Sequence, residues 1–175
     1  LKEALACYEH ANQLIDASIV WRERWPYLKQ LTIAGRDRLV NEKSALKQAI
    51  ALRAGLHIQE ARETLQDSLK RHPGSIMIRE ELIATLMDEA MLSPKDKKKY
   101  LTQALDQLEQ AKQSEGQLSA GSLAILGDLQ EQFARWNAAA ETYRKLSGLT
   151  EDRALKIKAE SRLAIILART TESSP

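Results

Sequence analysis

The feature that most constrains the fold is a short helical pattern that occurs three times. In each copy, an alanine is followed four residues later by a large apolar residue and then, after three more, by a small or apolar one. The copies are Ala61–Leu65–Ser68, Ala104–Leu108–Ala111 and Ala139–Tyr143–Leu146. Steps of four and three return to the same face of an α-helix, so each copy predicts one helix with a packed face. Alternating small and large residues allow a neighbouring helix to approach closely.

The copies recur at a nearly fixed period, because their alanines are 43 and 35 residues apart. A partner helix is predicted upstream of each copy, over 42–54, 76–91 and 120–133, and a last amphipathic helix over 152–168. "HPGS" (72–75), "SPKD" (93–96) and "GQLSAG" (116–121) separate these segments. Ser93 is predicted as a helix N-cap, with Pro94 in the first turn. A period of this length predicts stacked helix pairs.

Composition agrees with a soluble, helix-rich chain of 175 residues, since 43% is hydrophobic, 29% is charged and only 7 Gly and 4 Pro are present. A net charge of +2 gives no argument for nucleic acid or an anionic membrane. The single Cys7 excludes an internal disulfide, and apolar neighbours at helical spacing predict that it is buried. No apolar run reaches the length of a membrane-spanning helix, so no membrane insertion is expected. Cytoplasm and periplasm both stay open.

The sequence lacks the short motifs of the common catalytic and cofactor sites. It contains no phosphate-binding glycine loop, no dinucleotide fingerprint, no H-E-x-x-H and no C-x-x-C. His10, His57 and His72 are far apart, and adjacent acids such as Glu80 and Glu81 diverge around a helix. We therefore expect a protein that is not an enzyme, with no cofactor, metal site or catalytic residue.

The unit that starts at Ala120 resembles a tetratricopeptide repeat, a helix-turn-helix unit of 34 residues. The residues that carry the resemblance are Leu126, Gly127, Ala134, Arg135, Trp136, Ala139, Tyr143 and Leu146, and, in the unit from Glu42, Ala61, Leu65, Ser68 and Pro73. In that family the glycine lies where the two helices of a unit pack closest, and the tryptophan begins the second helix. Departures are Ala49 and Ile83 in place of that glycine, and about nine extra residues around 91–99.

The resemblance implies an all-α fold, a right-handed superhelical array of antiparallel helix pairs. Three pairs are expected at about 42–75, 76–119 and 120–153, followed by a capping helix at about 152–169. Residues 1–41 are expected to form N-terminal helices, a truncated or atypical repeat in which Ala4, Tyr8 and Ala11 repeat the pattern. A break is expected near Pro26 or Gly35.

The resemblance also implies a concave groove lined by the first helix of each pair, which binds a peptide or helical segment. The expected groove residues are Lys43, Lys47, Ile50, Arg53, Glu80, Ala84, Met87, Asp88, Ala124, Asp128 and Glu131. This groove would be basic at one end and acidic at the other. The expected function is a non-enzymatic scaffold that binds another protein or another region of its parent chain. A clamp for a C-terminal carboxylate is not expected, because Ile50, Ala84 and Asp128 replace the asparagine that it needs.

Three alternatives stay open. The repeats could be an accessory domain of a larger enzyme or of a secretion or assembly machine. Nucleic acid could bind the segment "WRERWPY" (21–27) and the lysine run "KDKKK" (95–99). We favour instead burial of Trp21 and Trp25 between helices and a solvated lysine loop, so nucleic acid is not the expected partner. Self-association through an end face is the third alternative.

Overall fold

The part of the chain that the structure describes is built from α-helices alone. This computed structural model describes residues 2–17, 26–115 and 118–172, and within them no strand occurs. The prediction of an all-α fold is therefore confirmed for these residues. The helices are α1 (Lys2–Ala17), α3 (Pro26–Ala54), α4 (Ile58–Arg71), α5 (Ile76–Leu92), α6 (Lys97–Glu115), α7 (Ala120–Gln132), α8 (Trp136–Leu149) and α9 (Arg153–Glu172). The chain forms two compact units, residues 1–81 and 82–175.

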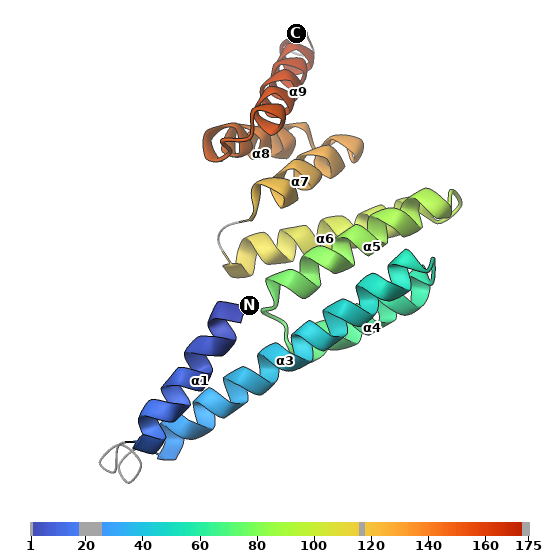
Figure 1. Cartoon of the computed structure of the whole chain (residues 1–175). Coiled ribbons are helices and arrows are strands. Elements are labelled where there is room, and N and C mark those ends of the chain that lie inside the picture. The colour runs from blue at the N-terminus through green and yellow to red at the C-terminus, as the bar shows by residue number, and fades with distance from the viewer. Residues whose placement is uncertain (1, 18–25, 116–117, 173–175) are drawn as a thin grey trace. The chain divides into compact units, whose positions relative to one another are not determined.

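In the first unit, α1 packs beside the N-terminal part of α3, and α4 folds back against its C-terminal part (Figure 1). Helix α3 begins at Pro26, where proline is well tolerated because the first turn needs no N–H donor. It continues through Gly35, so the alternative of a helix break at Gly35 is wrong. A Cβ atom at Gly35 would lie 2.5 Å from Tyr8 Cε1, which shows that the glycine permits close contact with α1. Residues 18–25, including Trp21 and Trp25, lie outside the described residues.

A buried carboxylate joins α3 to the residue before α5. Glu42 is only 4% exposed, and it accepts a hydrogen bond of 2.7 Å from Arg38 Nε and one of 2.9 Å from Ser75 Oγ. These contacts compensate for the removal of the charge from water. Ser75 directly precedes α5 in the sequence, so the same serine joins two segments that are 33 residues apart.

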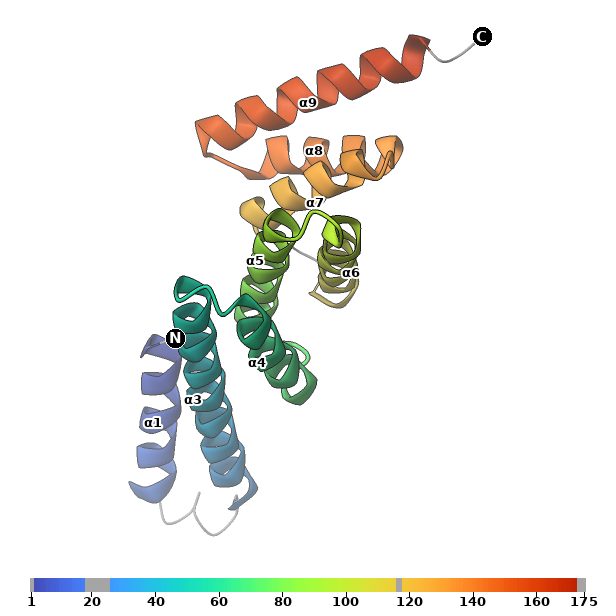
Figure 2. The same cartoon turned by 90° about the vertical axis from the view of Figure 1, so that its right-hand side faces the viewer.

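In the second unit, α8 packs against both α7 and α9, and α6 packs against α7 (Figure 2). A Cβ atom at Gly127 would lie 2.7 Å from Tyr143 Cε1, so α7 and α8 can approach this closely only because Gly127 has no side chain. Trp136 is the first residue of α8, as expected. Ser119 caps α7, since its hydroxyl accepts a 3.1 Å hydrogen bond from the Ser122 backbone N–H.

The repeated pattern marks buried positions in both units. All nine of its residues are at most 3% exposed, and each copy lies within a single helix, α4, α6 or α8. The prediction of three packed helix faces is therefore confirmed. In α1, the corresponding Ala4, Tyr8 and Ala11 are only half-buried.

Three local predictions need correction. Helix α6 begins at Lys97 and not at Pro94, because residues 94–96 form a turn, so Asp96 and not Ser93 directly precedes the helix. The extra residues of the middle unit mainly lengthen its helices: α5 has 17 residues and α6 has 19, against 13 in α7 and 14 in α8. Cys7 is exposed and not buried, because it lies beside the face of α1 that Tyr8 turns toward α3.

Candidate functional site

The expected binding residues of the first unit lie mainly along one face of α3. Lys47 is exposed, Lys43 is half-buried and Ile50 is 47% exposed. Val40 and Ile33, which are 49% and 36% exposed, occupy the same face at helical spacing. We call these five residues the α3 stripe. It combines three exposed branched aliphatic side chains with two cations, and surfaces of this mixed kind commonly mediate binding.

Arg53 and Glu80 complete the expected set of the first unit. Arg53 lies one turn after Ile50 and donates a 2.7 Å hydrogen bond to Glu81 on α5. This ion pair is only partly exposed, so Arg53 holds α3 to the start of α5. Glu80 is exposed on α5. The structure thus brings Lys43, Lys47 and Ile50 together and gives Arg53 a structural contact.

Among the expected residues of the second unit, only Asp128 is exposed. Ala84, Met87 and Asp88 are half-buried on α5. Ala124 is 5% exposed and packs inside the unit, so it offers almost no surface to a ligand. Asp128 and Glu131 take part in a polar network with α8 and α9.

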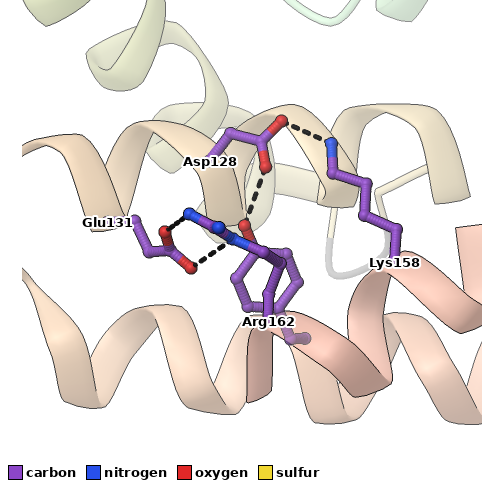
Figure 3. A network of polar contacts seen from close by, with 5 residues as sticks. Asp128, Glu131, Lys158 and Arg162 are labelled. Atoms are coloured by element: carbon purple, nitrogen blue, oxygen red, sulfur yellow. Dashed lines mark hydrogen bonds and ion pairs between the residues drawn. The ribbon is translucent and has the colours of Figure 1, made fainter. Parts of the chain in front are cut away.

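This network holds α7 to α9 through two matched pairs of charges (Figure 3). Lys158 Nζ lies 2.5 Å from Asp128 Oδ2, and Arg162 donates two hydrogen bonds to Glu131, one of them from Nε at 3.0 Å. The acids are three residues apart and the cations four apart, so one face of each helix presents both charges. The second oxygen of Asp128 accepts a 2.8 Å hydrogen bond from the Tyr143 hydroxyl.

The protonation of this network favours a structural role. Burial raises the pKa of Tyr143 well above its usual value, and the bond to Asp128 raises it further. The hydrogen bonds to Glu131 raise the pKa of Arg162. Tyr143 is therefore a neutral donor and Arg162 a cation at physiological pH. The sequence indicates a groove position for the two acids but not their partners on α9, because spacing within one helix does not show which face another helix will meet.

Metal binding, histidine chemistry and membrane insertion are the other roles to consider for the described residues. In those ranges, no three His, Cys, Asp or Glu side chains gather in a way that could hold a metal ion. His57 forms a local contact of 3.0 Å with Glu60 one turn away, at a site where both side chains are exposed. None of the described helices is long and apolar enough to cross a membrane.

Comparison with known proteins assigns no family to the chain. No protein-family model matches it, and no curated protein matches it in sequence.

Proposed function

We propose that this chain is a non-enzymatic scaffold of the tetratricopeptide type that binds a peptide or helical segment of another protein, or of its own parent chain. The α3 stripe is the observation that carries the proposal. Val40 and Ile50 are each about half exposed on a helix whose other faces already pack against α1 and α4. Exposed branched side chains cost solvation free energy, which a partner recovers when it covers them.

The spacing of the α3 stripe indicates the kind of partner that fits. Its apolar and basic residues extend along a single straight helix, which suits an amphipathic helix or extended peptide with acidic residues beside its apolar ones. Lys43 and Lys47 would orient such a ligand and speed its association more than they would tighten its binding. Covering a half-exposed Val40 or Ile50 contributes about 1 kcal/mol each.

Two further features support a scaffold of the tetratricopeptide type. The nine buried positions of the repeated pattern and the close Gly127–Tyr143 contact match what a helical-repeat architecture requires. The carboxylates Asp128 and Glu131 are engaged by α9. We therefore assign ligand binding to the α3 stripe and not to the acidic end of the groove that the sequence predicts.

The test compares the proteins that the native chain and its variants capture from a lysate of the source cell, and mass spectrometry identifies them. One variant, Lys43→Glu with Lys47→Glu, reverses the charge of the α3 stripe, and a second, Val40→Ala with Ile50→Ala, removes its apolar side chains. A control with the same charge change, Lys145→Glu with Lys156→Glu, alters exposed positions on α8 and α9. Circular dichroism establishes that every variant is folded.

We expect a protein that the native chain and the control retain and that both stripe variants lose. Titration of that partner should show binding weakened on the order of tenfold to thirtyfold by Val40→Ala with Ile50→Ala, which corresponds to about 2 kcal/mol. If all four captures contain the same proteins, the α3 stripe is not the binding surface.

A further inference from the structure

The second unit contains a hollow where the start of α6 meets the end of α7. It encloses about 550 Å³, a volume typical of ligand sites. We call it the lysine hollow, and it is lined by Pro94, Lys95, Lys97, Lys98, Leu101, Gln132, Phe133 and Ala134. None of these residues belongs to the α3 stripe or to the groove that the sequence predicts.

The rim of the lysine hollow concentrates positive charge that the chain does not neutralise. Lys95, Lys97 and Lys98 are exposed, and no ion pair engages them within the residues that the structure describes. Two other lysines are paired: Lys70 lies 2.8 Å from Asp67, and Lys158 lies 2.5 Å from Asp128. The run 95–99 contains four lysines and one aspartate, a local charge of +3.

The helix dipole adds to this unbalanced charge. The first turn of α6 contains lysines and no acidic residue, and Asp96, directly before the helix, is the single acid of the run that opposes their charge. Cations at this end of a helix are unfavourable, because the helix N-terminus itself has partial positive charge. An anion bound at the rim would relieve both the mutual repulsion of the lysines and their repulsion from the dipole.

The floor of the lysine hollow is apolar, and this distinguishes the hollow from a site that binds only a small anion. Leu101 is only 4% exposed and Phe133 is half-buried. Ala134 follows at a positive φ of 55°, and its backbone N–H bonds to the carbonyl of Glu131 at 2.9 Å, so the end of α7 is held in place. A small inorganic anion would leave this floor uncovered.

We propose that the lysine hollow binds an acidic peptide segment that inserts one aromatic or large aliphatic side chain onto the floor and places its carboxylates among Lys95, Lys97 and Lys98. Charge complementarity selects the acidic residues, and the Leu101–Phe133 floor selects the apolar one. Nucleic acid fits less well, because the lining has a single, half-buried aromatic ring and no arginine, whereas single-strand binding depends on exposed stacking platforms. The proposal does not depend on the α3 stripe.

The experiment measures fluorescence anisotropy of labelled peptides with the full chain. The main probe is a peptide with a central phenylalanine between acidic residues; its controls replace the acids by Gln and Asn, or the phenylalanine by Ser. The variant Lys95→Gln with Lys97→Gln and Lys98→Gln removes the rim charge and keeps a polar side chain at each position. The matched control neutralises exposed lysines elsewhere: Lys112→Gln, Lys145→Gln and Lys156→Gln. Labelled single-stranded RNA is tested in parallel.

We expect the rim variant to bind the acidic peptide about tenfold more weakly, because three exposed ion pairs are lost, and the matched control to bind it normally. The neutral peptide and the serine peptide should bind more weakly than the main probe, and added salt should weaken the main probe further. The proposal is overturned if the acidic and neutral peptides bind equally, or if the rim variant binds as the native chain does. Tighter, lysine-dependent binding of RNA would also overturn it.

Discussion

Replacing Gly127 by alanine tests the packing of α7 on α8 with a single methyl group. The new Cβ would lie 2.7 Å from Tyr143 Cε1 and 2.8 Å from Cζ. Carbon atoms in contact prefer about 3.5 Å or more. The ring has no exposed surface, and its hydroxyl is held by Asp128, so it cannot move aside freely.

The magnitude follows from two opposing terms. Overpacking costs about 1–3 kcal/mol, and contact with two carbon atoms of a fixed ring places Gly127→Ala near the upper end. Alanine recovers about 1 kcal/mol through its greater helix propensity. We therefore expect a net loss of about 2 kcal/mol in the free energy of unfolding, measured by urea denaturation followed by circular dichroism.

Two other glycines supply the controls. A Cβ atom at Gly148, in the last turn of α8, would meet nothing within 4 Å, so Gly148→Ala should stabilise the chain by up to about 1 kcal/mol. Gly35→Ala would place its Cβ 2.5 Å from Tyr8, but Tyr8 is half-buried and can shift, so a change near zero is expected. A urea midpoint for Gly127→Ala at or above that of the native chain would refute the reasoning. The cost should also shrink when Tyr143 is first replaced by leucine.

Three further predictions concern single side chains. Because the folded state raises the pKa of Tyr143, the unfolded chain loses that proton first; this contribution to stability is complete below about pH 10 and falls above it by up to about 1.4 kcal/mol per pH unit. Urea denaturation of Tyr143→Phe should show a smaller decline over the same range, and an equal decline would contradict the assignment. Ser119→Ala removes the α7 cap and should lower the free energy of unfolding by about 1 kcal/mol, whereas an unchanged urea midpoint would mean that the cap is dispensable. Exposed Cys7 should react with a thiol reagent without denaturant; reaction only after unfolding would restore the prediction that it is buried.

Much of the local structure could be predicted because helices follow local rules. The steps of four and three around Ala61, Ala104 and Ala139 identified three helices and their buried faces, since burial along a helix depends on spacing that is visible in the sequence. The start of α8 at Trp136 was expected from the resemblance to the tetratricopeptide repeat. Helix ends were less secure: Ser93 resembled an N-cap, yet the turn at 94–96 shifted the start of α6 to Lys97.

The candidate sites required contacts between residues far apart in the chain. Lys43, Lys47 and Ile50 were expected on one face because the resemblance places them in the first helix of a repeat, and α3 presents them at helical spacing. The roles of Asp128 and Glu131 were not, because their partners lie 30 and 31 residues away on α9. The lysine run was visible in the sequence, but its apolar floor comes from the end of α7.

By itself, therefore, the sequence determined that the chain is helical and which faces of α4, α6 and α8 are packed, because these follow from neighbours three or four residues apart, but it did not show that α3 continues unbroken from Pro26 to Ala54. Only the tertiary structure decided that Gly127 lies against Tyr143, that α9 neutralises the acids of α7, and that Phe133 and Lys97 line the same hollow. Each of these depends on which face of one helix meets which face of another, and that is settled by packing between segments distant in sequence.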